Sequence, residues 1–568
     1  MFKFDDLLRE VGQFGRYQIL KYVIFVFGNI PVGWHTLSII FAGGKQDYWC
    51  KIPELGNFSS ADQKAIGIPR EMTLSGEFFN SKCRRFDLNF TEITEYQLRH
   101  WNESEIVGNT TKTIGCSSWT FDQSEYISTI YSQFGLTCDR SWLVPMTQTV
   151  YMFGWLLGTT ILGWISDRFG RRIAYFLTYT GVVVMGSIQA FVPNIYLYIV
   201  TKLLLGASGG AYFAVGLVLI LEVTGQKQRV FVSVIYHIGF DTAMFFLPLI
   251  AWFVRDAYHL QMILGVVPAI LLPTFFFIDE SPRWLLQKHR FDEAELLLAK
   301  IAETNGKKLH DYGQLVTEIK QATRDVERAQ DLAAKVGHQP TLIDIMKMPN
   351  LRKISCINFL QWFTCAGSFY GLMLMPTNLG TNAYIGVALA GAAVPVAFAI
   401  VIPVIIKLGR RVSMGGTLIT LGTLLAVSAV VMNFQVLTPL VVVLIFMCRV
   451  CVQGAFCTIY LFTVELFPTV VRNIGVGTGS SLARVGGLLA PQLAFLVSIW
   501  RPLPVLILAA FAIVTGALNY FLPETLNRKL PETLEDGEKF GRKRKKRDTD
   551  NADIKMNGRE EEMEAFKE

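Results

Sequence analysis

Long apolar runs separated by charged, polar or proline-containing segments are the most regular feature of the chain. A helix that crosses a bilayer needs about 20 predominantly apolar residues. Twelve stretches have this character, near residues 19–41, 143–165, 173–193, 195–221, 231–254, 258–278, 354–375, 382–406, 412–432, 437–464, 473–498 and 502–522. We therefore predict an all-α polytopic membrane protein with twelve transmembrane helices.

Composition supports this fold class. Hydrophobic residues make up 51% of the 568 residues and charged residues 17%, whereas soluble domains are near 25% charged. This balance argues against a soluble enzyme, a fibrous protein and a disordered protein. The net charge of +7 does not indicate a nucleic-acid partner, because membrane proteins gather Lys and Arg on their cytoplasmic side.

Two long gaps interrupt the apolar runs and suggest the domain organisation. The predicted units are a cytoplasmic N-terminus (1–18), a six-helix bundle that includes a long loop at 42–142 (19–278), a cytoplasmic linker (279–353), a second six-helix bundle (354–522) and a charged cytoplasmic tail (523–568).

The loop at 42–142 has the features of an extracellular segment. It carries the glycosylation acceptors Asn57, Asn89, Asn102 and Asn109. It also carries the cysteines Cys50, Cys83, Cys116 and Cys138. The confinement of Asn-x-Ser/Thr triplets to one loop indicates that this loop passes through the secretory lumen. The four cysteines allow two disulfides in three possible pairings.

Basic residues in the short loops agree with this orientation. On the side opposite the long loop lie Arg168, Arg171, Arg172, Lys227, Arg229, Lys407, Arg410, Arg411 and Arg472. The short outer loops offer Arg255 and Arg501. This positive-inside pattern places both termini in the cytoplasm. The basic run 542–547 in the tail either touches anionic lipid or is a solvated tail.

Charged motifs recur at a nearly constant offset, which indicates an internal repeat. Gly170-Arg171-Arg172 matches Gly409-Arg410-Arg411, Glu222 and Arg229 match Glu465 and Arg472, and Glu280 matches Glu524. Two parallel six-helix repeats around a midplane site are typical of a large class of secondary transporters. Charges at corresponding inner helix ends suit a switch between two conformations.

These motifs resemble the major facilitator superfamily. Its signature between spans two and three is similar to Gly163-x-x-x-Asp167-Arg168-x-Gly170-Arg171-Arg172. The stretches 280–285 and 523–526 resemble the sugar-porter and organic-ion groups. The long Cys-bearing loop and the stretch 464–475 resemble the organic ion transporters of solute carrier family 22, and most of all its organic cation and carnitine carriers.

The repeat and the resemblance together identify candidate gating residues. They are Asp167, Arg168, Arg171, Arg172, Glu222, Arg229, Glu280, Arg283, Arg410, Arg411, Glu465, Arg472 and Glu524. The resemblance to carnitine carriers leaves an alternative open for Glu465, which is assistance to sodium coupling.

Polar residues inside spans are costly and usually face a cavity. Arg484, in the middle of span eleven, is the strongest candidate for substrate binding. The resemblance implies that anion and carnitine carriers have Arg at this position, while carriers of simple cations have an acidic residue. His35, Lys202, His237, Asp241 and Arg449 also qualify, and structural roles are favoured for Lys202 and Arg449.

Span five supplies the opposite charge, Asp241, with aromatic neighbours at helical spacing. Aromatic faces attract an ammonium that has no N–H to donate. The predicted binding set is Arg484, Asp241, Tyr236, Phe240, Trp362, Phe369, Tyr460 and Phe462. Four of these, Trp362, Phe369, Tyr460 and Phe462, resemble cavity positions of the family.

Other motifs point away from cofactors. Cys448-x-x-Cys451 lies in an apolar span, where two buried thiols are favoured over a metal site. No phosphate-binding loop is present, so ATP is not implied. Gly154-x-x-x-Gly158, Gly206-x-x-x-Gly210 and Gly367-x-x-x-Gly371 favour close helix contacts.

The sequence therefore predicts a plasma-membrane secondary transporter of small organic cations and carnitine-like zwitterions, which works by alternating access and uses sodium or a proton as a possible coupling ion. An organic anion exchanger is the alternative. A membrane enzyme is disfavoured because the chain has no His-Glu-x-x-His motif and no nucleophile elbow. A channel would not explain the duplicated charges. Neither a cofactor nor a metal is expected.

Overall fold

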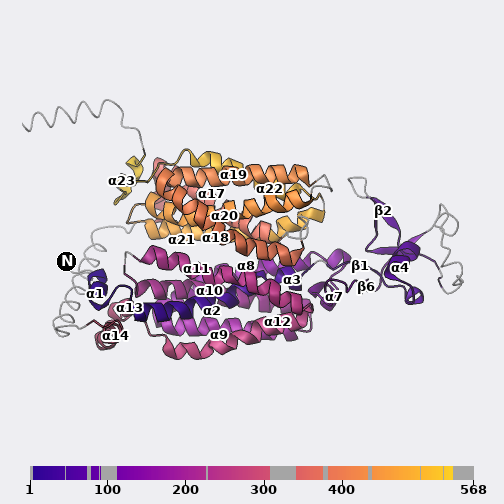
Figure 1. Ribbon diagram of the computed structural model, residues 1–568, viewed down its shortest axis with the longest axis horizontal. Coiled ribbons are helices and arrows are strands. Elements are labelled where there is room, and N and C mark those ends of the chain that lie inside the picture. The colour runs from indigo at the N-terminus through magenta and orange to yellow at the C-terminus, as the bar shows by residue number, and fades with distance from the viewer. Residues whose placement is uncertain are drawn as a thin grey trace, which may run out of the picture.

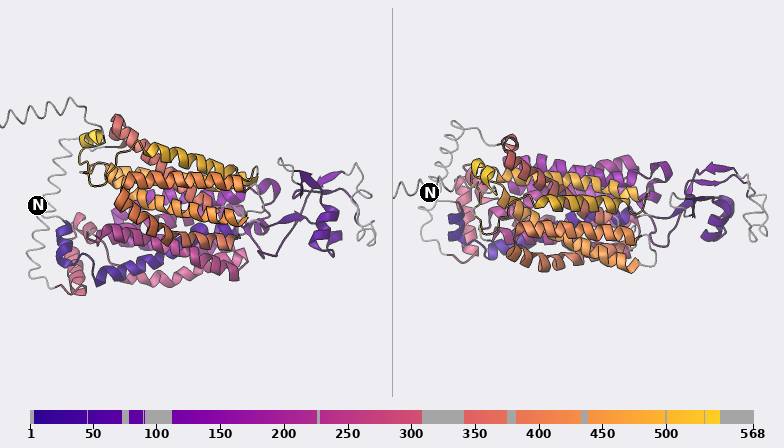
Figure 2. Two further views of the ribbon diagram at one scale, coloured as in Figure 1. Left: turned by 45° about the horizontal axis from the view of Figure 1, so that its top comes forward. Right: turned by 90° about the horizontal axis from the view of Figure 1, so that it is seen from above.

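The computed structural model describes residues 4–44, 46–72, 78–88, 90, 112–225, 228–307, 341–374, 382–432, 438–498, 500–528 and 530–541. Two helical bundles lie side by side, one from each half of the chain (Figure 1). A small domain built from the first long loop extends beyond one end of the bundles, as Figure 2 shows from two further sides. We call this end the outer end and the opposite end the inner end.

The N-terminal bundle contains six helical spans. They are α2 (Arg16–Leu37) continued by α3 (Ile39–Ala42), α8 (Leu143–Phe169), α9 (Arg171–Ile188), α10 (Ile195–Glu222), α11 (Arg229–Phe253), and α12 (Ala257–Val266) continued by the 3-10 segment η5 (Val267–Phe277). Side-chain oxygens satisfy backbone N–H groups at two outer starts, since Asn194 accepts from Leu197 and Asp256 accepts from His259.

The C-terminal bundle repeats this arrangement. Its helices are α17 (Pro349–Leu374), α18 (Ala383–Leu408), α19 (Arg410–Val431), α20 (Thr438–Leu466), α21 (Arg472–Phe495) with η8 (Leu496–Ser498), and α22 (Leu503–Asn519). The turns at the matching inner ends are alike: Gly170 ends α8 at φ 113° and Gly409 ends α18 at φ 93°, a backbone conformation that favours glycine.

Each predicted span corresponds to a helix of the described chain. Nine of these helices are long and apolar enough to cross a membrane by length and composition. The others are α17, α21 and the 17-residue α22. Polar side chains such as Asn358 and Gln361 lower the mean hydropathy of α17. The helix buries these side chains. The predicted all-α polytopic fold is confirmed.

Apolar side chains cover the outside of the bundles as well as their core. Ile270 and Phe276 are each 79% exposed, although a soluble protein would bury most such residues. Helices that are apolar on all sides are expected where lipid takes the place of water.

Glycines permit the tightest helix crossing, between α8 and α10. A side chain at Gly158 would overlap the backbone of Ala207, and one at Gly206 would overlap the backbone of Tyr151. Two of the three predicted glycine motifs therefore serve close packing. At Gly367 the nearest atom to an added Cβ lies 3.7 Å away, so that glycine is not required for contact.

The outer domain contains three two-stranded antiparallel sheets in its described part. β1 (Tyr48–Cys50) pairs with β6 (Trp119–Phe121), β2 (Arg70–Met72) with β3 (Phe78–Asn80), and β4 (Arg84–Phe86) with β5 (Thr113–Gly115). The short helices η1 (Pro53–Leu55), α4 (Ser60–Gly67), α7 (Ile130–Phe134) and η3 (Cys138–Arg140) complete it. Trp49, Ile52 and Leu55 belong to its small apolar core.

The structure pairs the four loop cysteines as Cys50 with Cys116 and Cys83 with Cys138. Sequence alone left three pairings open. Asn57 is exposed on this domain, whereas Asn89, Asn102 and Asn109 lie outside the described residues. Glycosylation itself stays a prediction.

Small helices gather at the inner end. They are α1 (Phe4–Val11), α13 (Pro282–Gln287), α14 (Phe291–Thr304), α16 (Leu342–Lys347) and α23 (Leu534–Lys539). α1 packs on α14 through a separate apolar cluster that includes Leu8 and Ile301. Lys227 and the basic run 542–547 lie outside the described residues.

Candidate functional site: a central cavity and its gates

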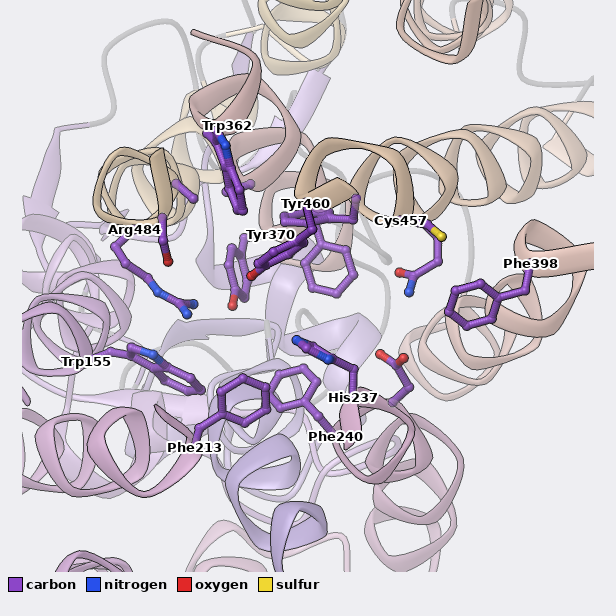
Figure 3. A pocket seen from close by; sticks show the side chains of 17 residues that line it. Trp155, Phe213, His237, Phe240, Trp362, Tyr370, Phe398, Cys457, Tyr460 and Arg484 are labelled. Carbon is purple, nitrogen blue, oxygen red and sulfur yellow. The ribbon is translucent and has the colours of Figure 1, made fainter. Parts of the chain in front are cut away.

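A cavity of about 160 Å³ lies between the two bundles near the middle of the helices (Figure 3). Its walls come from both halves of the chain. The lining residues are Trp155, Phe213, His237, Phe240, Asp241, Trp362, Ala366, Phe369, Tyr370, Phe398, Gln453, Phe456, Cys457, Tyr460, Ser480, Ala483 and Arg484.

One charge of each sign reaches this cavity. The Arg484 guanidinium lies 5.0 Å from the centre of the Trp155 ring, and it points between that ring and the Tyr370 hydroxyl (Figure 3). Asp241 is 7% exposed, and its Oδ2 atom has no hydrogen-bond partner among the described residues. Because a buried carboxylate oxygen without a partner is costly, this atom is available to a positively charged ligand.

Aromatic rings form most of the remaining wall. Trp362 meets Tyr460 edge to face at 4.5 Å between ring centroids. Across the bundle interface, His237 lies 6.0 Å from Tyr460. Phe213 lies 5.3 Å from His237. Such a wall suits the apolar and cation–π surface of an alkylated ammonium.

Six of the eight predicted binding residues line the cavity: Arg484, Asp241, Phe240, Trp362, Phe369 and Tyr460. Tyr236 and Phe462 are not among the residues that line it, and a part for them in binding stays a prediction. The Tyr236 hydroxyl instead donates to the Phe213 carbonyl at 2.9 Å. Phe462 is fully buried because residues two apart on a helix point to different sides, and Tyr460 is the one that faces the cavity.

Sequence reasoning missed several wall residues. Gln453, Phe456 and Cys457 line the cavity and precede Tyr460 on α20 at spacings of seven, four and three. The helical i, i+3, i+4, i+7 pattern starting from Tyr460 would have found them. Phe398 on α18 had no such signal because it lies in a uniformly apolar segment.

The inner end of the N-terminal bundle carries a charge network. Arg171 lies 3.4 Å from Glu222 and 2.9 Å from Asp167. Glu280 accepts hydrogen bonds from the backbone N–H groups of Arg171 and Arg172 at 2.9 and 3.2 Å. Burial raises the pKa of the Glu280 carboxyl above its usual value, against the lowering effect of these donors.

The C-terminal bundle carries a network of the same design. Arg410 donates to Glu465 at 3.0 Å. Glu524 accepts from the backbone N–H groups of Arg410 and Arg411 at 2.9 and 3.1 Å. Thr525 adds a hydrogen bond of 2.5 Å to Glu465. Each network ties helix ends within its own bundle.

The remaining candidate gating residues make other contacts. Arg229 donates to the Thr224 carbonyl at 3.1 Å, and Arg472 donates to the Thr469 hydroxyl at 3.3 Å. Arg171 and Arg410, the first Arg of each Gly-Arg-Arg motif, are the residues described in contact with the two glutamates. Arg168 lies over the Trp164 ring at 5.3 Å, and Arg283 is exposed on α13.

A further inner cluster was not predicted. Asp279 accepts from Lys21 at 2.8 Å, from Lys300 at 2.7 Å and from Tyr17 at 2.8 Å. Burial alone would raise the pKa of Asp279, but the hydrogen bonds from the two lysines and Tyr17 outweigh it and hold the pKa below its usual value. The cluster fastens α14 to the inner end of α2.

The bundles touch each other at the outer end. Thr149 on α8 accepts from Gln492 on α21 at 3.1 Å and donates to the Leu488 carbonyl at 3.3 Å. Tyr384 on α18 packs against Phe41 and Trp252, at centroid distances of 5.1 and 5.3 Å. These contacts close the outer end above the cavity.

Comparison with known proteins gives the class of the molecule. The profile of the family described as "Sugar (and other) transporter" matches residues 106–536. The fold is similar to the xylose transporter XylE from E. coli in its inward open conformation, with a TM-score of 0.57 at 14% identity over 92% of this chain and 99% of that one. The fold and the family match define a membrane transporter of the major facilitator type, and not an enzyme.

Curated relatives narrow this class. The "Organic cation transporter protein" of Drosophila melanogaster is 33% identical over 95% of each chain. "Solute carrier family 22 member 3" of Mus musculus is 30% identical over 95% of this chain and 96% of the relative. "Organic cation/carnitine transporter 2" of Homo sapiens is 29% identical over 94% and 93%. The chain belongs to solute carrier family 22, as its motifs predicted.

Proposed function

We propose that this protein is a plasma-membrane secondary transporter of small organic cations and quaternary-ammonium zwitterions such as carnitine. The observation that carries the proposal is the presence of Arg484 and Asp241 in one aromatic-lined cavity between the bundles. A carboxylate on Arg484 and an ammonium on Asp241 and the rings would use both charges. The names of the relatives, which include organic cation and carnitine transporters, support this substrate class.

Alternating access follows from the two-bundle design. In the described conformation the outer ends touch through Thr149 and Tyr384, while each inner charge network stays within one bundle. Rocking of the bundles about the cavity would exchange these contacts for inner ones. Each bundle moves as a unit because its inner network ties its own helix ends together.

Orientation and coupling are part of the proposal. The glycosylation acceptors and basic loops favour an extracellular outer end and cytoplasmic termini. Sodium or a proton is the proposed coupling ion. For Glu465, a gating role is supported by its bonds to Arg410 and Thr525, and sodium coupling is the alternative.

An organic anion exchanger is the second candidate function. It is favoured by Arg484, whose guanidinium lies in the cavity over Trp155, and disfavoured by the buried oxygen of Asp241.

A competition assay tests the substrate class. Uptake of labelled carnitine into cells that express the chain would be measured against unlabelled tetraethylammonium, carnitine and benzoate, with and without sodium. The proposal predicts saturable uptake with competition by carnitine and tetraethylammonium. Saturable uptake of labelled benzoate, without uptake of carnitine or tetraethylammonium, would support the anion exchanger. Loss of uptake without sodium, with the same competition order, would identify sodium as the coupling ion.

A further inference from the structure

A second cavity lies at the outer end, between the bundles and the outer domain. Its volume is about 450 Å³. Elements of both bundles line it, through residues such as Gln148 on α8, Ala383 on α18 and Phe495 on α21. Tyr48 and Lys82 of the outer domain line it as well. We call this space the outer vestibule. Gln148 adjoins the contact residue Thr149 on α8, so the vestibule lies next to the outer contacts between the bundles.

The charged group that lines the vestibule is positive, and its partner Asp47 is not among the lining residues. Among its described lining residues, Lys82 is the one charged side chain. The central cavity, in contrast, has a charge of each sign. A simple cation would therefore gain no ion pair here, whereas a carboxylate would gain one from Lys82.

Lys82 is held firmly in place. Its carbonyl accepts from the Trp119 indole at 3.1 Å, and its ammonium binds Asp47 at 2.7 Å and lies 5.2 Å from the centre of the Tyr48 ring. The next residue, Cys83, is bridged to Cys138, three positions before the vestibule residue Ser141 on the way into α8. The disulfide thus ties the backbone beside Lys82 to the segment that leads into α8. An ammonium has three donors, so the bond to Asp47 leaves donors for a ligand.

A complementary hydrogen-bond acceptor, Gln148 on α8, lines the vestibule on the side of the bundles. Gln148 is 1% exposed, and its Nε2 atom donates to the Thr36 carbonyl at 3.0 Å. Its Oε1 atom is buried with no hydrogen-bond partner among the described residues. A carbonyl oxygen of this kind attracts the positive end of a ligand, and the rings of Tyr131 and Phe495 lie in the same wall.

We propose that the outer vestibule is a second binding site for small zwitterions, in which Lys82 binds the carboxylate while the ammonium lies toward Gln148 and the aromatic wall. The site holds a zwitterion outside the closed outer contacts and passes it to the central cavity when the bundles part there. This proposal rests on the proposed function for the identity of the solute.

Lys64 provides a matched control. It binds the same Asp47 carboxylate at the same distance of 2.7 Å and lies over the Trp49 ring at 4.3 Å. Lys64 does not line the vestibule. Lys64→Gln and Lys82→Gln therefore remove equivalent contacts from the outer domain, and only the second removes charge from the vestibule.

The test is equilibrium binding of labelled carnitine to the purified full-length protein. The wild type and Lys64→Gln should each bind at two classes of site. Lys82→Gln should weaken one class roughly 10- to 100-fold, as expected for loss of a charge-assisted hydrogen bond, and Lys82→Arg should restore it. Arg484→Ala should weaken the other class. Labelled tetraethylammonium should bind at one class that Lys82→Gln leaves unchanged.

Two results would overturn the vestibule site. One is a single class of carnitine site in the wild type that Lys82→Gln leaves intact. The other is an equal loss in Lys64→Gln and Lys82→Gln, which would assign the effect to the folding of the outer domain. Uptake in cells separates this proposal from the proposed function. Lys82-dependent binding without uptake of either solute would refute only the transport proposal, and uptake with one binding class would refute only the vestibule.

Discussion

At their inner ends the two bundles are built alike, but along the central cavity they differ. Arg171 with Glu222 and Arg410 with Glu465 are equivalent pairs. In the cavity, the N-terminal bundle supplies the carboxylate of Asp241, and the C-terminal bundle supplies Arg484. Both bundles need the same tether for their helix ends, whereas a zwitterion needs opposite charges on its two sides. The two bundles are therefore alike at their inner ends and carry opposite charges in the cavity, as the proposed function requires.

The bundles also differ in how they hold a buried cation on equivalent helices. Arg449 on α20 donates to the Gly386 carbonyl at 2.6 Å and to the Leu372 carbonyl at 3.1 Å. Lys202 on α10 is fully buried, and the hydrogen bond described for it is a long one of 3.4 Å to Ser38. The guanidinium thus joins α20 to α17 and α18, whereas the ammonium has one long hydrogen bond and lies 5.6 and 5.7 Å from the centres of the Tyr151 and Tyr198 rings.

The largest effect is expected for Arg484→Ala, which removes one of the two opposite charges of the cavity. A charge-assisted hydrogen bond contributes about 1.5–3 kcal/mol, and each 1.36 kcal/mol is about tenfold. Arg484→Ala should therefore weaken carnitine uptake roughly 10- to 100-fold, while tetraethylammonium uptake survives or improves because a like charge has left the cavity. Initial rates at matched surface expression measure this. An equal loss for both solutes would make Arg484 a packing or gating residue.

Stability measurements sharpen the comparison of the two buried cations. Arg449→Met leaves two buried carbonyls without their donor, so the free energy of unfolding should fall by about 1–3 kcal/mol. Lys202→Met should lower it less, because the ammonium has one long hydrogen bond and two ring contacts, and a buried charge with weak partners is often replaced by an apolar side chain without loss. Thermal unfolding of the two purified variants in one detergent checks this order, and equal shifts would contradict it.

Asp241→Asn tests the other side of the cavity. The substitution keeps the shape and removes the charge that an ammonium would meet. Uptake of carnitine and of tetraethylammonium should each fall by about tenfold, the equivalent of about 1.4 kcal/mol. Concentration dependence of uptake is the measurement. Loss of carnitine uptake alone would show that Asp241 does not bind the ammonium group.

The smallest effects are expected for substitutions of Glu465 and Glu222, the equivalent glutamates at the inner ends of the two bundles. Glu465→Gln should lower turnover about threefold, because Glu465 accepts from both Arg410 and Thr525. Glu222→Gln should lower it less, since its bond to Arg171 is 3.4 Å long. Turnover per surface transporter would be compared at several sodium concentrations. A sodium dependence altered only in Glu465→Gln would favour coupling over gating.

Local patterns in the sequence were sufficient to predict the helices, the internal repeat and two charged residues of the cavity. Apolar runs determined the twelve helices because a bilayer imposes one length and one composition on every span. The recurrence of Gly-Arg-Arg and of the glutamates at constant offset indicated the repeat. Arg484 and Asp241 stood out because a charge inside a span is costly. Each of these inferences depends on residues that are near one another in the chain or on a repeated motif.

Only the tertiary structure decided which of several similar residues meet. It paired Cys83 with Cys138, brought Arg171 to within 3.4 Å of Glu222, and turned Tyr460 toward the cavity while it buried Phe462. It also placed Lys82 above the bundles. These outcomes depend on the rotation of each helix about its axis and on contacts between segments far apart in the chain. Hydropathy along the sequence does not determine either, because many of these helices are apolar on nearly all sides.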